Sequence, residues 1–322
     1  MSAAENAERP VPSSAQLKAQ AFGLGFDLAG IALLGEPSTT AEFDSWIANG
    51  YAGEMHYLER GADLRRDARR PEPGMRSAIV VALNYGGTEP GGSIARYARG
   101  DDYHDVMRDK LDALGRWLVD ESGGTLRTRA YVDTGPVLER DLAQRAGLGW
   151  FGKNTNLINP DLGSFFFIGA LFTDAELAPD TPFDEDRCGT CTRCLEACPT
   201  QAFTAPRSLD ATRCISYLTI ELRGEIPAEF HAAIGENLYG CDICQDVCPW
   251  NISFSKELRE KAFAPRDFLA GKTSRELALE ILGMNPESYA AAFKGSAVKR
   301  AKLAGLQRNA KIVLANIERR TP

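Results

Sequence analysis

All eight cysteines of this 322-residue chain lie between Cys188 and Cys248. Thiolates at close, regular spacing can hold iron-sulfur clusters, which transfer electrons. In the bacterial ferredoxin pattern, three cysteines of a run bind one 4Fe-4S cluster and the fourth binds the neighbouring cluster. The first run of this chain matches that pattern at every position and reads Cys188-x2-Cys191-x2-Cys194-x3-Cys198-Pro199.

A second cysteine run has the same ending but lacks its first ligand. We assign that place to Cys214, which lies 27 residues before Cys241. Crossed ligation between the two runs then predicts two 4Fe-4S clusters. The second run reads Cys241-x2-Cys244-x3-Cys248-Pro249; the first cluster is predicted on Cys188, Cys191, Cys194 and Cys248, and the second on Cys198, Cys214, Cys241 and Cys244.

Structural zinc is the alternative for these cysteines, since paired C-x2-C motifs also build zinc sites. Zinc ribbons rarely carry a further cysteine and proline in both halves, which favours the clusters.

Disulfides fit poorly with the location that we expect. The N-terminus carries acids and a proline where a secretory signal needs a basic start, and no apolar run is long enough to cross a bilayer, so we expect a cytoplasmic protein.

Clusters must deliver their electrons to an acceptor, and a flavin, a nicotinamide, a corrinoid or a bound substrate are all candidates. No G-x-G-x-x-G follows a predicted strand, so a nicotinamide site has weak support. The glycine-rich segment 147–152, followed by Lys153 and Asn154, fits two roles. It is either a cradle for phosphate or amide groups of a large cofactor or an ordinary tight turn, and both remain open.

Asp133 is the carboxylate that we single out for chemistry. It ends a β-rich run and precedes Gly135-Pro136, where we expect a helix to begin. An acid buried beside a flat apolar cofactor has a raised pKa and can hold a proton at neutral pH for delivery. The alternative, which spacing alone favours, is a helix N-cap.

His104 lies in a segment that faintly resembles the Asp-x-His-x-x-Gly motif of cobalamin proteins. Met107 stands where that motif has glycine. We therefore expect His104 to be a surface residue at the start of a helix.

The elements that must position these residues alternate between strands and helices. Residues 26–34, 77–85, 128–133 and 164–173 read as strands, and 104–120 as a helix with Leu111, Leu114 and Leu118 on one side. This pattern predicts a layered α+β domain. Six acids and two prolines in residues 174–187 mark its end. We expect a disordered tail over 1–15, an α/β domain over 16–180, a ferredoxin-like domain over 181–255 and a helical region over 256–322.

The C-terminal region is basic in an otherwise acidic chain. Residues 294–320 carry a local charge of +7, although the formal net charge of the whole chain is −7. A segment of such positive charge suits binding to the phosphate backbone of a nucleic acid. The alternative is that these basic residues form a solvated helix face. The predicted phosphate contacts are Lys299, Arg300, Lys302, Arg308 and Lys311.

Four further motifs accompany the cysteine runs between residues 17 and 317. They are Gly53-Glu54-Met55-x2-Leu58, Tyr97-Ala98-x-Gly100-x-Asp102-Tyr103-His104, Val132-Asp133-x2-Pro136-x-Leu138-Glu139-Arg140 and Ala146-Gly147-Leu148-Gly149-Trp150-x-Gly152-Lys153. Together with the cysteines, they make the chain closely similar to the epoxyqueuosine reductase family.

That resemblance implies a cobalamin-dependent enzyme with two 4Fe-4S clusters, which reduces epoxyqueuosine to queuosine at the wobble position of tRNA. It implies a nitroreductase-like cobalamin-binding domain, a ferredoxin-like domain and a small HEAT-like helical region. Electrons would come from an external donor, and we expect a monomer. Asp133 matches the family's proton donor and a cobalamin contact; further cobalamin contacts are implied at Arg60, Ile158, Gly169, Ser216 and Asp242.

Two rival functions remain open at this point. A corrinoid enzyme of the reductive dehalogenase type would share the cofactors, but it would leave the basic C-terminal face without a role. A ferredoxin-type electron carrier would use the clusters, but it would leave the α/β domain unexplained.

Overall fold

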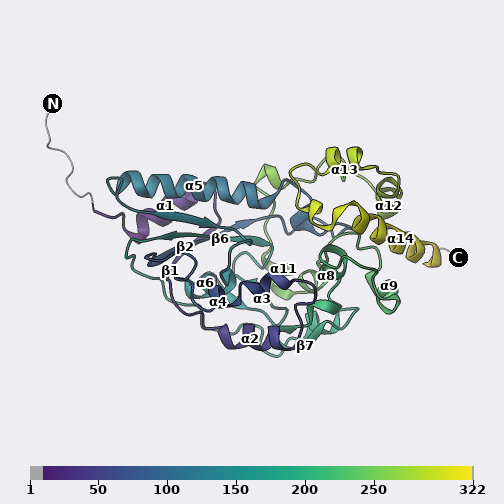
Figure 1. The fold of residues 1–322 in the computed structure, drawn as a ribbon, viewed down its shortest axis with the longest axis horizontal. Coiled ribbons are helices and arrows are strands. Elements are labelled where there is room, and N and C mark those ends of the chain that lie inside the picture. The colour runs from purple at the N-terminus through teal and green to yellow at the C-terminus, as the bar shows by residue number, and fades with distance from the viewer. Residues whose placement is uncertain (1–9, 321–322) are drawn as a thin grey trace.

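The computed structural model describes residues 10–320. It forms an α+β layer at one end and a group of helices at the other, with the cysteine-bearing loops adjoining both (Figure 1). Residues 1–9 of the tail predicted over 1–15 lie outside the described residues. Structure begins slightly earlier than the predicted residue 16, because Ser13 and Gln16 form a capping box that starts α1 (Ser14–Gly23).

A four-stranded antiparallel sheet organises the first half of the chain. Its strand order is β1-β2-β6-β3, and each strand falls within a range predicted from the sequence. The expected layered α+β class is therefore confirmed. The strands are β1 (Leu28–Leu33), β2 (Ser77–Asn84), β6 (Phe166–Thr173) and β3 (Thr128–Tyr131).

Helices cover both faces of this sheet (Figure 1). Alternate residues of β2 enter opposite cores, so Ile79 packs beneath α1 and α5 (Tyr103–Glu121), whereas Val80 packs toward α6 (Glu139–Arg145). Leu111, Leu114 and Leu118 of α5 are fully buried, as predicted. Burying one such side chain contributes about 1.5–3 kcal/mol, which fixes α5 against the sheet.

Asp102 determines where α5 begins. Its carboxylate accepts a hydrogen bond from the backbone N–H of His104 and so caps the helix. The first turn of α5, which carries Tyr103 and His104, thereby lies near the turn that follows β3.

The prediction that a helix begins at Gly135-Pro136 is wrong. β3 ends at Tyr131, and α6 begins only at Glu139. A tight turn intervenes because Gly135 packs directly on the Tyr131 ring, where a Cβ would meet ring carbon at 2.2 Å. Asp133 is consequently no N-cap; it lies within the turn with a φ of 57°.

The glycine-rich segment 147–152 forms one side of a small hairpin, β4 (Trp150–Phe151) with β5 (Leu157–Ile158). A Cβ at Gly149 would lie 2.1 Å from the Ile158 carbonyl oxygen. Gly149 thus admits the chain's own backbone, as expected of an ordinary tight turn.

The second half of the chain consists of short helices around the cysteines and longer helices at the C-terminus. Ile215 and Leu218 of the cysteine region share one hydrophobic core with Ile281 and Leu306 of the C-terminal helices. The boundary predicted at residue 256 therefore divides elements that are packed together. The helices are α7 (Arg193–Glu196), α8 (Ile215–Ile220), α9 (Ala228–Ile234), α10 (Ile243–Asp246), α11 (Pro249–Phe254), α12 (Ser274–Leu282), α13 (Pro286–Ala292) and α14 (Lys302–Arg320).

Three further α-helices and one further hairpin lie in the described residues, besides four short 3-10 helices at Arg96–Ala98, Ala211–Arg213, Lys261–Phe263 and Ala297–Ala301. The α-helices are α2 (Thr40–Ala48), α3 (His56–Arg60) and α4 (Ala62–Arg65), and the hairpin pairs β7 (Phe203–Ala205) with β8 (Ser208–Leu209). Within the described residues, no helix is long and apolar enough to pass through a bilayer.

Candidate functional site

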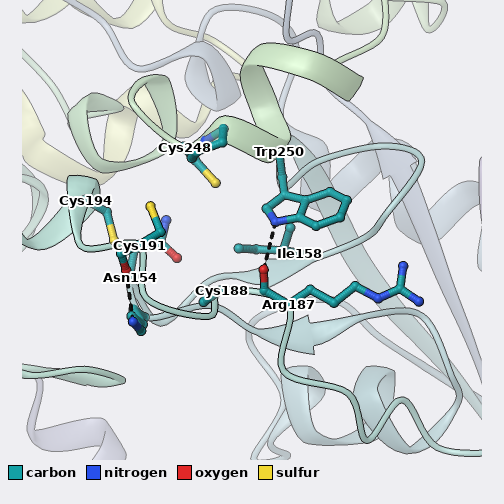
Figure 2. Close-up of a pocket in the computed structure, with 10 residues that line it drawn as sticks. Asn154, Ile158, Arg187, Cys188, Cys191, Cys194, Cys248 and Trp250 are labelled. Atoms are coloured by element: carbon teal, nitrogen blue, oxygen red, sulfur yellow. Dashed lines mark hydrogen bonds between the residues drawn. The ribbon is translucent and has the colours of Figure 1, made fainter.

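Four cysteines line a cavity of about 160 Å³ beside α11. Cys188, Cys191 and Cys194 come from the first run, and Cys248 comes from the end of the second. Figure 2 shows the Cys248 side chain opposite the loop that carries Cys191 and Cys194. The structure thus brings together the four residues that crossed ligation assigns to the first cluster.

Residues that follow the glycine-rich segment hold this cavity in shape. The Lys153 Nζ donates to the carbonyl oxygens of Gly189 and Cys191, at 2.6 and 2.9 Å. Asn154 donates to the carbonyl of Cys244 at 3.3 Å. Both side chains therefore support the cysteine loops of the two runs.

Surrounding protein opposes the ionisation of thiols in the second set. Burial, with the charges of Cys214 and Cys198 adding to it, raises the pKa of the Cys241 thiol to about 12. Burial and the charges of Cys214, Cys241 and Cys194 raise the pKa of Cys244 well above its usual value. Thiols that disfavour each other's ionisation lie near one another, and bound iron would neutralise that charge. No set of three or more ligand side chains in residues 10–320 is spaced to hold a single metal ion.

Asp133 lies in the turn after β3 and faces the first turn of α5. Its Oδ2 is 3.4 Å from the His104 Nε2. Burial opposes ionisation of Asp133, but the hydrogen bond and charge of His104, a hydrogen bond from Tyr103 and the charge of Arg140 outweigh it and lower the pKa of Asp133. The raised pKa expected from the sequence is that of an acid buried beside a cofactor, and it stays a prediction.

His104 is no ordinary surface residue, contrary to expectation. Its side chain is only 27 % exposed, and its Nδ1 lies 2.7 Å from the Asp102 Oδ1. The imidazole stacks on Tyr103, which in turn stacks on Phe167 of β6. The imidazole is thus fixed between two carboxylates, and the Asp-Tyr-His sequence was the signal that pointed to it.

Further ionisable groups surround Asp133 and lie beyond what the sequence singled out. Burial and the charge of Asp133 raise the pKa of Glu139 to about 8, and its Oε1 is buried without a hydrogen-bond partner in the described structure. Arg65, which is buried, and Tyr57 interact electrostatically with Asp133.

The surroundings of Asp133 fit a large polar cofactor. Its side chain is 64 % exposed, although neighbouring protein is the strongest influence on its ionisation. The orphaned Glu139 oxygen adds a polar atom that an amide-rich cofactor can satisfy.

The residues implied as cobalamin contacts lie in different settings. Arg60 ends α3 and is exposed, Ser216 hydrogen-bonds the Cys214 thiol, and Ile158 lines the cluster cavity. Gly169 faces α5, because a Cβ there would lie 2.9 Å from Leu111.

Asp242 has a partner of its own. The buried Asp242 carboxylate accepts hydrogen bonds from the backbone N–H and the guanidinium of Arg96, at 2.8 and 3.1 Å. This ion pair joins the cysteine region to the α/β layer.

The basic C-terminal residues divide into two kinds. Lys299, Lys302 and Lys311 are exposed. Arg300 forms a two-point ion pair with Glu221, at 2.8 and 2.7 Å, and its guanidinium lies over the Tyr57 ring.

Arg308 was predicted to bind phosphate, and the structure gives its guanidinium another role. It donates to the carbonyl oxygens of Leu218 and Leu222, at 2.6 and 2.8 Å. These hydrogen bonds satisfy backbone carbonyl groups at the end of α8. We therefore do not propose Arg308 as a phosphate contact.

An α+β layer joined to paired cysteine runs defines an iron-sulfur oxidoreductase. Residues 187–251 match the family model described as a 4Fe-4S double cluster binding domain, and residues 65–134 match the model of the epoxyqueuosine reductase QueG, DUF1730. The chain belongs to the epoxyqueuosine reductase family, because relatives of that name at 43 % and 37 % identity align with 91 % and 94 % of it.

Relatives with that name align over most of the chain. The epoxyqueuosine reductase of Cyclobacterium marinum is 43 % identical over 302 residues, which cover 91 % of this chain and 94 % of the relative. That of Escherichia coli is 37 % identical and covers 94 % and 80 %. A crystal structure of epoxyqueuosine reductase with an epoxyqueuosine-modified tRNA-Tyr stem loop superposes with a TM-score of 0.85 at 33 % identity, covering 94 % of this chain and 81 % of that one.

Family membership settles the open alternatives about cofactors and class. The double-cluster model confirms two 4Fe-4S clusters in place of zinc. The family is cobalamin-dependent, as the resemblance implied. The chain is an oxidoreductase, and neither the dehalogenase nor the simple electron carrier is retained.

Proposed function

We propose that this chain reduces the epoxide of epoxyqueuosine in tRNA to the alkene of queuosine, with electrons passing from an external donor through both clusters to cobalamin. The observation that carries the proposal is the fold match, over 94 % of the chain, to an epoxyqueuosine reductase crystallised with its modified stem loop. We also propose that the protein acts in the cytoplasm, which suits a tRNA substrate. We propose that it acts as a monomer.

The cluster ligands are part of this proposal. The first cluster takes Cys188, Cys191, Cys194 and Cys248, and their common cavity supports this assignment. The second takes Cys198, Cys214, Cys241 and Cys244, and the mutual effects of these thiols on ionisation support it.

Bound cobalamin would supply strongly reducing electrons to the epoxide. Arg60 and Asp133 offer it exposed side chains. Ile158, Ser216 and Asp242 each adjoin a cluster ligand or its cavity, so contacts there would bring the cofactor close to the clusters. Gly169 contributes by letting α5 pack closely on β6.

Asp133 delivers a proton to the oxygen that leaves the ring. Converting an epoxide to an alkene consumes two electrons and two protons and releases one water. The carboxyl must hold its proton when substrate is bound, and burial by cofactor and substrate would raise its pKa for that purpose.

The tRNA backbone lies against the exposed lysines Lys299, Lys302 and Lys311, with Arg300 beside them. Arg300 contacts the Tyr57 ring, and Tyr57 interacts with Asp133. Arg300 thereby links the basic segment to Tyr57, whose ionisation the charge of Asp133 affects.

The test is conversion of the nucleoside. Protein reconstituted anaerobically with iron, sulfide and cobalamin is given a chemical reductant and epoxyqueuosine-containing tRNA, and the digested nucleosides are measured by mass. We expect loss of one oxygen atom from epoxyqueuosine, dependent on cobalamin. Unchanged epoxyqueuosine, with both clusters reduced and cobalamin bound, would contradict the proposal.

A further inference from the structure

The proton balance of the proposed reaction leaves one proton without a source. Each turnover consumes two protons, whereas a single carboxyl, Asp133, carries one. The inference below rests on the proposed function and asks which group supplies Asp133 again.

His104 is the side chain whose geometry suits this task. Its Nε2 lies 3.4 Å from the Asp133 Oδ2, and its Nδ1 lies 2.7 Å from the Asp102 Oδ1. Asp102 is itself fixed as the N-cap of α5, and the imidazole is stacked on Tyr103. The ring therefore points one nitrogen at each carboxylate. With 27 % of its side chain exposed, it also remains open to solvent.

We propose that His104, oriented by Asp102, is a positioning residue that holds the Asp133 carboxylate and reloads it with a proton. The Nε2–H bond of His104 breaks and an O–H bond forms at Asp133. Asp133 passes that proton to the departing oxygen, and solvent returns a proton to His104. Two such passages, with two electrons from the clusters, balance the formation of the alkene and one water.

His104 is charged when this transfer is needed. Burial disfavours the imidazolium, but hydrogen bonds to Asp102 and Asp133 and the charges of both carboxylates raise the pKa of His104 to about 9. It thus holds a proton at neutral pH.

The other groups near Asp133 are less suited to the relay. The pKa of Tyr103 is raised well above its usual value, so its proton is tightly held. Arg65 and Arg140 are cations that do not release protons near neutral pH. Glu139 is protonated near neutral pH, but it hydrogen-bonds backbone N–H groups and has no side-chain bond to Asp133. Tyr57 interacts with Asp133 only through its charge.

The experiment compares His104→Gln and Asp102→Asn with the wild type in the holoenzyme. Turnover is measured with excess reductant from pH 6 to 10. His104→Gln keeps a hydrogen-bonding group but carries no proton, so we expect turnover to fall by about 10²-fold. Tight binding of tRNA and both cluster signals should persist. The wild-type rate should decline as the pH approaches 9, and this decline should be absent from His104→Gln.

A rescue measurement separates the relay from a structural role. In His104→Gly, added imidazoles should restore turnover, and the restored rate should follow the pKa of each imidazole. His56→Gln is the matched control, because His56 is an exposed histidine that pairs with Glu59 and lies outside the proposed relay, and its turnover should equal that of the wild type.

Three outcomes are decisive. Wild-type turnover and an unchanged pH profile in His104→Gln, alongside an inactive Asp133→Asn, would overturn the relay but leave the proposed function standing. Failure of every imidazole to rescue His104→Gly when its clusters, cobalamin and tRNA affinity are intact would also overturn it. A wild-type holoenzyme without activity would instead contradict the proposed function.

Discussion

At the scale of single residues, Asp133 stands out by its backbone. It occupies the left-handed region with a φ of 57°, which a non-glycine residue adopts at some cost. Hydrogen bonds from His104 and Tyr103 hold its carboxylate there. Strain at this position is therefore compensated by contacts that aim the acid.

The substitution Asp133→Asn tests the acid directly. An amide cannot protonate the leaving oxygen, so we expect turnover to fall by at least about 10²-fold. The side chain keeps nearly the same shape, so both cluster signals should remain in electron paramagnetic resonance spectra. Full activity in this variant would remove Asp133 from the mechanism.

Glu139 leads to a prediction about stability. Its pKa is raised to about 8 in the folded protein from an ordinary 4.5, so the folded state binds more protons than the unfolded state between these values. Its contribution to stability is therefore present below pH 4.5 and is lost as the pH rises through about 8.

Glu139→Gln should remove this dependence, because the amide does not ionise. We expect Tm to fall less between pH 5 and pH 8 in the variant than in the wild type, as measured by calorimetry. Equal declines in the two proteins would show that Glu139 is already ionised near pH 5.

At the scale of elements, the hairpin of β4 and β5 forms part of the wall of the cavity proposed for the first cluster. Gly149→Ala would place a Cβ 2.1 Å from the Ile158 carbonyl oxygen, and backbone at that distance must move. Such overpacking costs about 1–3 kcal/mol. We expect a lower Tm and fewer irons per protein. Gly23→Ala is the matched control, since a Cβ there meets nothing within 4 Å.

The sequence predicted the elements well where burial imposes a period. All four strands of the sheet and the leucine face of α5 follow from such patterns. The start of α6 was missed because it depends on Gly135 packing against Tyr131, a contact that composition does not encode. The place of His104 was missed for a similar reason, since the turn after β3 and the start of α5 meet only in three dimensions.

Among the site residues, the cysteines give the most specific prediction, because their spacing is typical of cluster ligands, and four of them line one cavity. Arg308 shows the opposite case. Its charge suggested phosphate, but whether a guanidinium faces solvent or backbone carbonyls depends on how α14 packs against α8.

At the scale of the whole molecule, charge is polarised toward the C-terminal helices. Replacing Lys299, Lys302 and Lys311 with glutamine should weaken tRNA binding and flatten its salt dependence. Each lost phosphate contact lowers the slope of log K against log salt by about 0.7–0.9. Fluorescence anisotropy at several salt concentrations measures this slope. Lys256→Gln, an exposed lysine outside the basic segment, should leave it unchanged.

The central claim is that electrons stored in the two clusters reach the epoxide by way of cobalamin, and a single-turnover experiment tests it most directly. Holoprotein is reduced, freed of excess reductant and mixed with epoxyqueuosine-containing tRNA, while cluster spectra and nucleosides are followed together. We predict that both clusters reoxidise as up to one queuosine forms per protein, and that neither change occurs without cobalamin. Product formation while the clusters stay reduced, or equal reoxidation in protein lacking cobalamin, would contradict the account.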